Sequence, residues 1–202
     1  MFCRWAGGDP APQVTDRPRF GRMSRFDTGE SRNRMSASLG LPALPAGATI
    51  LPPDRRQSPT ALRIQRGVRR LFSEMGCVTL PEFSLVNGRR ADVIALCGAG
   101  RLTIVEIKSS VADFRADRKW PDYRDFCDRF FFAIPEDVPE SLIPEECGLI
   151  VADGYGAGIL REAPEHPLSG PRRKAVTLRF AHSAARILHA LADPGAVREG
   201  AL

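Results

Sequence analysis

The sequence predicts an α/β domain in which a mixed β-sheet is flanked by helices, and three features carry this prediction. Residues 61–75 repeat apolar side chains at helical spacing. Residues 77–107 hold three runs rich in valine and isoleucine, separated by glycine-containing turns, which is typical of antiparallel strands. Residues 129–134 and 148–152 are continuous apolar runs, as in strands buried on both faces. The expected order is helix, three strands, helix, strand (αβββαβ).

The first helix and the strand after it have recognisable boundaries. Ser58 followed by proline fits an N-cap with proline at the first helical position, and Gly76 fits the end of the helix. Residues 77–86 read as the first strand. Asn87-Gly88 then predicts a two-residue hairpin turn.

The second half of the chain supplies the remaining elements. Residues 121–127 predict a short helix, and residues 158–161 a short edge strand. Residues 175–192 close the domain with a helix that repeats Leu and Ala on one side.

The chain of 202 residues divides by composition into a tail and one domain. Residues 1–57 contain nine arginines, no lysine and five acidic residues, with many Gly, Pro and Ser and no persistent period. We therefore expect residues 1–57 to be disordered and residues 58–202 to form the folded domain. The tail arginines could contact phosphates, but a solvated basic tail is the simpler explanation.

Composition also limits where the protein could work. No run approaches the ~20 apolar residues that span a bilayer, and the first residues lack the apolar core of a secretory signal. The five cysteines are scattered and the three histidines show no zinc-binding spacing, which favours reduced thiols in the cytoplasm. A net charge of +5 and a pI of about 9.3 permit a nucleic-acid partner. No oligomeric state is predicted.

The hairpin formed by the second and third predicted strands carries the candidate chemistry. If its turn centres on Ala99, Asp92 lies opposite Glu106, with Lys108 next on the same face. Two adjacent carboxylates repel each other, and a bound Mg²⁺ or Mn²⁺ would remove that repulsion. The lysine could orient a water molecule or neutralise a phosphate. The alternative is a solvated carboxylate–lysine face of an ordinary hairpin.

The pattern on these two paired strands resembles the core of the PD-(D/E)XK nuclease superfamily: Asp92, thirteen residues, and then Glu106-Ile107-Lys108. Ala91 stands where the superfamily has proline. The chain resembles the MmcB-like DNA repair proteins more closely, over about residues 60–193. The segments that carry this resemblance are 88–92, 105–110, 113–117, 119–123 and 148–153.

The resemblance implies a restriction-endonuclease-like core and a role in DNA repair. It implies that Asp92, Glu106 and the carbonyl of Ile107 hold Mg²⁺ (or Mn²⁺), and that Lys108 positions the attacking water. A third acidic residue is common in the superfamily, and Glu82 and Glu74 are the candidates. A strict two-residue turn places Glu82 opposite Val93, pointing away from the site, unless Pro81 introduces a bulge that re-aims it.

Four residues are candidate contacts to nucleic acid: Arg90, Lys119, Trp120 and Tyr123. The two aromatic rings could stack on a base or lie beside a phosphate path, or they could instead close the core of the sheet. The predicted function is metal-dependent hydrolysis of DNA. The alternative is a catalytically silent DNA-binding or scaffolding module, and an RNA substrate stays open.

Overall fold

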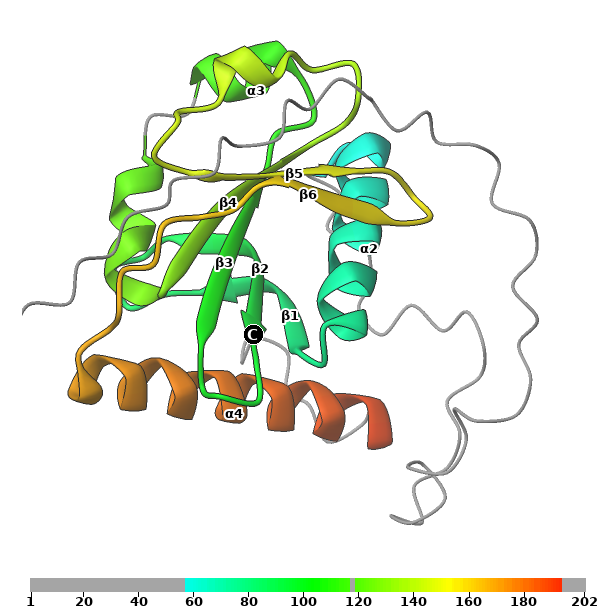
Figure 1. The fold of residues 1–202 in the computed structure, drawn as a ribbon. Coiled ribbons are helices and arrows are strands. Elements are labelled where there is room, and N and C mark those ends of the chain that lie inside the picture. The colour runs from blue at the N-terminus through cyan, green and yellow to red at the C-terminus, as the bar shows by residue number, and fades with distance from the viewer. Residues whose placement is uncertain (1–56, 117–118, 194–202) are drawn as a thin grey trace, which may run out of the picture. The chain divides into compact units, whose positions relative to one another are not determined.

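The computed structural model describes residues 57–116 and 119–193, and these residues build one six-stranded sheet with helices against it (Figure 1). The predicted disorder of residues 1–57 lies outside the described residues, apart from Gln57. The strands are β1 (Val78–Ser84), β2 (Arg90–Leu96), β3 (Leu102–Ile107), β4 (Arg129–Ile134), β5 (Gly148–Ala152) and β6 (Ala157–Arg161). The helices are α2 (Pro59–Glu74), α3 (Val111–Ala116) and α4 (Gly170–Ala192), with 3₁₀ segments η1 (Trp120–Phe126) and η2 (Glu140–Leu142).

The strands lie in the sheet in the order in which they occur in the chain. Strands β1, β2 and β3 pair antiparallel, β3, β4 and β5 pair parallel, and β6 returns antiparallel to β5. The predicted mixed α/β sheet with αβββαβ order is therefore confirmed. Every residue of β3 is buried, because this strand is central and is covered on both faces.

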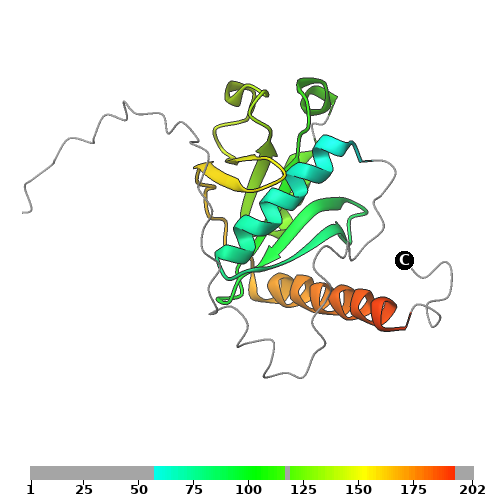
Figure 2. The ribbon, with the colours of Figure 1, turned by 90° about the vertical axis from the view of Figure 1, so that its right-hand side faces the viewer.

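Each face of the sheet has its own apolar cluster. On one face, Ile64, Val68 and Phe72 of α2 pack with buried side chains of β2 to β5. In Figure 2, α2 runs across this face. On the other face, Val176 and Phe180 of α4 join the 3₁₀ segment η1 and the opposite side chains of the same strands. The alternation of side chains along β3 therefore sends one set to each cluster.

Helix α2 is held at both its start and its middle. Ser58 caps it, since its Oγ accepts the Ala61 N–H at 3.0 Å, with proline at the first helical position as predicted. At Gly67 the helix touches the turn between β5 and β6. A Cβ placed there would lie 2.3 Å from the carbonyl oxygen of Asp153 and 2.4 Å from that of Gly156, so only glycine fits.

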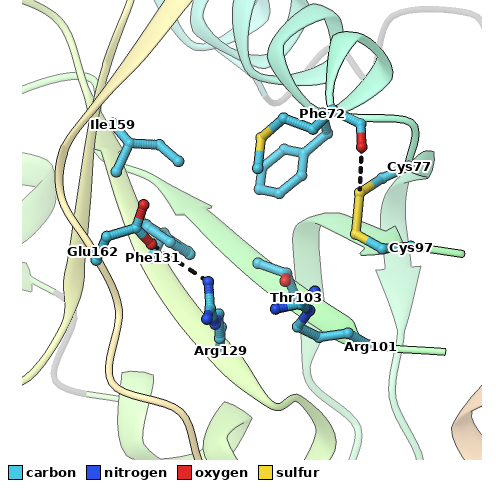
Figure 3. A pocket seen from close by; sticks show the side chains of 10 residues that line it. Phe72, Cys77, Cys97, Arg101, Thr103, Arg129, Phe131, Ile159 and Glu162 are labelled. Atoms are coloured by element: carbon cyan, nitrogen blue, oxygen red, sulfur yellow. Dashed lines mark hydrogen bonds and ion pairs between the residues drawn. A yellow bond between two sulfur atoms is a disulfide. The ribbon is translucent and has the colours of Figure 1, made fainter. Parts of the chain in front are cut away.

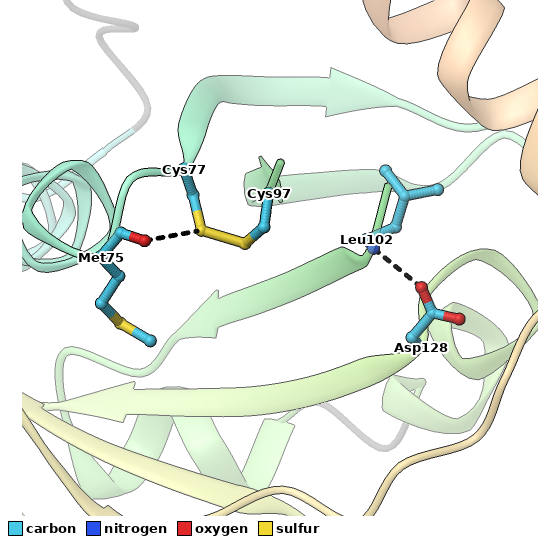
Figure 4. Close-up of a disulfide and its surroundings, with 5 residues drawn as sticks. All are labelled: Met75, Cys77, Cys97, Leu102 and Asp128. Atoms are coloured by element: carbon cyan, nitrogen blue, oxygen red, sulfur yellow. Dashed lines mark hydrogen bonds between the residues drawn. A yellow bond between two sulfur atoms is a disulfide. The ribbon is translucent and has the colours of Figure 1, made fainter. Parts of the chain in front are cut away.

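Helix α4 is tied to the sheet by one buried carboxylate. Asp128 is 2% exposed, and both of its oxygens accept hydrogen bonds from Arg173 at 2.6 Å. The same carboxylate accepts the Leu102 N–H at 2.8 Å (Figure 4) and the Leu168 N–H at 2.9 Å. Burial alone would raise the pKa of Asp128, but these donors, led by Arg173, hold it below its ordinary value.

The cysteines differ from the prediction of reduced thiols. Cys77 and Cys97 form a disulfide at the ends of β1 and β2 (Figure 4). The cysteines directly extend the antiparallel ladder whose last pair is Val78 and Leu96, so strand pairing alone brings them together. Cys127 and Cys147 are buried thiols, and burial raises their pKa values to about 12 and about 11.

A cavity of about 120 Å³ adjoins this disulfide (Figure 3). Phe72 and Phe131 form its apolar wall, while Arg101, Arg129 and Glu162 stand at its polar side. It lies at the starts of β3 and β4, which is the end of the sheet opposite to Glu106 and Lys108.

Candidate functional site

The hairpin of β2 and β3 has the predicted register. Val93 pairs with Val105 and Ile94 pairs with Ile104, so the next position along places Asp92 across from Glu106. The backbone N–H of Asp92 also donates to Glu106 Oε1 at 3.3 Å. The two carboxylates predicted to form the site are therefore neighbours on paired strands.

The carboxylate of Asp92 is held in place by the facing strand. Its Oδ2 accepts the Ile107 N–H at 2.7 Å, which fixes one oxygen and orients the other. Burial raises the pKa of Asp92 above its ordinary value, and the nearby charge of Asp113 acts in the same direction. The hydrogen bond from Ile107 and the charges of Lys108 and Arg90 oppose this rise without cancelling it.

Glu106 and Lys108 are almost completely buried, with 4% exposure each. The backbone N–H of Lys108 donates to the Ala133 carbonyl at 2.9 Å, so β4 holds the residue that follows β3. Its ammonium lies 6.0 Å from the centre of the Phe132 ring. Ionised groups at this depth are costly unless they are paired, and the charge of Lys108 lies close enough to Asp92 to favour its carboxylate form.

These side chains open onto a cavity of about 400 Å³. Asp92, Glu106, Ile107 and Lys108 line it from the sheet, and the loop after β3 and the start of α2 complete it. The other lining residues are Gln57, Ser58, Ala61, Ser109 and Asp113. A cavity of this size at the ends of strands can admit a solvated ion together with part of a ligand.

Asp113 is a member of this site that the sequence reasoning did not select. Its Oδ2 accepts the Ser109 N–H at 3.0 Å and the Ser109 hydroxyl at 3.3 Å. Its own N–H donates to Ser110 Oγ at 3.1 Å. Serine followed three residues later by an acid is the pattern of a capping box, so the sequence contained a signal that this loop turns back beside Lys108.

The predicted placement of Glu82 opposite Val93 is wrong. Phe83 pairs with Ala91 and Leu85 N–H donates to Arg89 O at 2.7 Å, so the turn has three residues instead of two. This one-residue shift in register places Glu82 opposite Asp92 on the neighbouring strand. Glu82 adopts a left-handed backbone conformation, with φ of 52°.

The side chain of Glu82 lies beside the site and does not line its cavity. It pairs with Arg90, whose Nε lies 2.7 Å from Oε2, and it accepts a hydrogen bond from the Gln57 amide. Glu74 ends α2, whereas the first residues of that helix line the cavity, so ~20 Å of helix separates Glu74 from the site. Of the two candidate third acids, only Glu82 is close.

The candidate nucleic-acid contacts divide into two groups. Arg90 and Lys119 are exposed. Tyr123 is 5% exposed, stacks on Phe130 and donates its hydroxyl to the carbonyl of Arg90 at 3.2 Å. Trp120 also stacks on Phe130, and its ring is covered by Arg124 at 4.7 Å. The two rings therefore close the core, which is the alternative that the sequence left open, and Tyr123 offers no free face to a base.

The donor set fits a hard divalent cation. Mg²⁺ is commonly bound by one or two carboxylates together with water and substrate phosphate oxygens. Asp92 and Glu106 supply two carboxylates, and Ile107 lines the same cavity. No cluster of three or more His, Cys, Asp or Glu suited to a metal ion occurs among residues 57–116 and 119–193.

The fold and the site together define a class of protein: an α/β domain whose mixed sheet presents an Asp–Glu–Lys constellation at the end of a central strand. The chain belongs to the family described as DNA repair protein MmcB-like, whose family model matches residues 49–195. No helix of the described part is long and apolar enough to cross a membrane.

Two solved structures are similar to this chain. A protein of unknown function from Silicibacter pomeroyi, SPO1766, is 43% identical, with a TM-score of 0.68 over 72% of this chain and 99% of that one. SfsA from Pyrococcus furiosus, solved in complex with Ca²⁺, is 14% identical, with a TM-score of 0.31 over 51% of this chain and 64% of that one. Among curated proteins, none matches the chain.

Proposed function

We propose that this protein is a Mg²⁺- or Mn²⁺-dependent nuclease that hydrolyses phosphodiester bonds in DNA. The observation that carries the proposal is the juxtaposition of Asp92 and Glu106 on paired strands, with Lys108 beside them, at a cavity of about 400 Å³. Membership of a DNA repair family supports DNA as the substrate. A DNA substrate in turn favours the cytoplasm as the place of action.

Each residue has a distinct role in this proposal. Asp92 and Glu106, with the carbonyl of Ile107, would hold the metal, which would supply Lewis-acid stabilisation of charge on the phosphate. The Ile107 N–H keeps one oxygen of Asp92 occupied and so directs the other into the cavity. Lys108 would orient the attacking water and donate a hydrogen bond to the oxygen on which charge develops.

The surroundings would keep these groups in position. Strand β4 holds the backbone of Lys108, and Asp113 holds the loop that follows it. Positioning of this kind can account for a large part of a catalytic effect, because reacting groups must lie within a few tenths of an ångström of their working geometry.

The test is cleavage of a panel of single-stranded, duplex, flapped and branched DNA, and of RNA, with and without Mg²⁺ or Mn²⁺. Glu106→Gln and Lys108→Met should each reduce cleavage at least ~100-fold, because each removes a group that acts in the transition state. Glu140→Gln, an exposed carboxylate of η2, is the matched control and should cleave like the wild type. Equal rates for all four proteins would refute the assignment.

One contact favours the alternative, a catalytically silent DNA-binding module. Asp92 Oδ2 already accepts a backbone N–H, so the carboxylate could be retained to fix the hairpin. This alternative predicts that the wild type binds DNA but cleaves no member of the panel with any divalent cation.

A further inference from the structure

The positive charge of the described domain is concentrated on helix α4. Between Gly170 and Ala192 the chain has five arginine or lysine residues and no aspartate or glutamate, whereas residues 58–169 have 14 basic and 17 acidic residues. A helix of 23 residues with one sign of charge is uncommon, since surface helices usually alternate charges. The rest of the domain is slightly acidic, so an electrostatic partner of negative charge would be drawn to α4.

Part of this charge is already used inside the protein. Arg173 binds the buried Asp128, and Arg172 pairs with Asp125 at 2.9 Å. Within the part of the chain that the structure describes, no ion pair joins Lys174, Arg179 or Arg186 to a carboxylate. These three cations are exposed, so their charge is accessible to an outside partner.

Arg172, Arg179 and Arg186 recur every seven residues and therefore lie along one side of the helix, over ~21 Å. We call these three residues the α4 stripe. The stripe runs next to the face that carries Val176 and Phe180, which is packed against the sheet. Duplex DNA presents one phosphate charge per ~1.7 Å of its axis, so a stripe of this length faces several phosphates.

One residue of the stripe, Arg179, contacts β1, the strand beside the β2 strand that carries Asp92. Arg179 Nε donates to the carbonyl of Ser84 at 2.6 Å, and Ser84 pairs with Arg90 across β1 and β2. Arg90 stands two residues before Asp92 and pairs with Glu82. A polyanion on the stripe would therefore continue past Arg90 toward Asp92.

We propose that the α4 stripe, chiefly Arg179 and Arg186, binds the phosphate backbone of the DNA and directs it to the site, an inference that rests on the proposed function for its substrate. A nucleic acid explains the surface better than an anionic membrane. A membrane-binding helix needs a continuous apolar face free to enter the lipid, whereas Val176 and Phe180 of α4 are buried in the core and Ala184 and Ile187 are partly buried against it. The exposed leucines of α4 are Leu178, Leu188 and Leu191.

The experiment measures duplex DNA binding by the full chain, from fluorescence anisotropy between 50 and 300 mM NaCl, in EDTA so that cleavage plays no part. Arg179→Gln/Arg186→Gln should reduce the slope of log K against log salt by about 1.8, because two phosphate contacts are lost. Between 50 and 200 mM salt, its affinity should therefore fall about twelve-fold less than that of the wild type. Arg66→Gln/Arg70→Gln on α2, which removes the same charge from exposed positions on the other face, should leave the slope unchanged.

Arg179→Lys/Arg186→Lys separates charge from structure, since it keeps both cations but replaces the guanidinium that contacts Ser84. It should retain the wild-type slope, and the glutamine variant should retain its cooperative melting. A glutamine variant with the wild-type slope, a control variant with an equal loss, or a wild type that binds anionic vesicles and not DNA would each overturn the proposal. Cleavage is scored separately, so the predicted fall in slope for the α4 variant, together with a wild type that cleaves no DNA of the panel, would retain the stripe and reject the nuclease.

Discussion

Replacing Asp92 with asparagine tests the site without knowledge of the substrate. Asp92 and Glu106 occupy directly opposed positions, for which Cβ atoms lie ~5 Å apart. Two unit charges at ~5 Å and an effective dielectric constant of ~20 repel by ~3 kcal/mol. Attraction to Lys108 offsets much of this, so we expect a net gain of ~1 kcal/mol for Asp92→Asn without metal, or ~2–4 °C in melting temperature. Asparagine keeps an oxygen that can accept the Ile107 N–H.

The pH dependence of this gain has a definite sign. Burial raises the pKa of Asp92 in the folded state, so the folded protein holds this proton more tightly than the unfolded chain does. The contribution of Asp92 to stability therefore falls as pH rises from the ordinary carboxyl value of ~3.9 through the raised one. The advantage of the asparagine variant should grow as pH rises through the raised pKa of Asp92 and should vanish below about pH 4.

Added metal should stabilise the wild type much more than the asparagine variant. Mn²⁺ at about 100 times its dissociation constant should stabilise the wild type by ~2.7 kcal/mol, because it binds only the folded state. The asparagine variant should gain little. The assay is thermal unfolding from pH 4 to pH 8, with EDTA and with MnCl₂. A variant that is less stable in EDTA at pH 7, yet gains as much from Mn²⁺ as the wild type, would show that Asp92 is a structural residue.

Three further predictions concern the fold. Asp128→Ala should lower stability by ~3 kcal/mol in urea unfolding, because it leaves a guanidinium and two backbone donors without their buried acceptor; a loss under ~1 kcal/mol would contradict this. Gly67→Ala should cost at least ~1–3 kcal/mol, since the added methyl meets backbone oxygens, and a melting temperature equal to the wild type would exclude that contact. Alkylation followed by mass analysis should label Cys77 and Cys97 only after reduction, and Cys127 only after unfolding; labelling of the unreduced pair would show free thiols.

Local patterns in the sequence determined most of the sheet and the centre of the site. The glycines around Ala99 set a tight turn, and the two-residue alternation of a strand then places Asp92 opposite Glu106 whatever the rest of the fold does. The apolar runs that became β4 and β5 were recognisable because buried parallel strands must be apolar on both faces.

Tertiary structure decided the features that depend on one residue of register or on distant segments. Asn87-Gly88 fits a two-residue turn, but the pairing of Leu85 with Arg89 makes the turn one residue longer. Glu82 therefore lies opposite Asp92. The length of the turn depends on which side chains of β1 pack in the core, and the turn sequence alone does not determine it.

The same holds for residues that meet only after folding. Asp113 lines the cavity because a short turn follows β3. Cys77 and Cys97 are bonded because they extend the β1–β2 ladder by one pair. Trp120 and Tyr123 entered the core because Phe130 of β4 offers them a ring to stack on. Local sequence therefore determined the paired carboxylates and the lysine, whereas packing between distant segments determined what surrounds them, since burial and electrostatic environment exist only once the layers have come together.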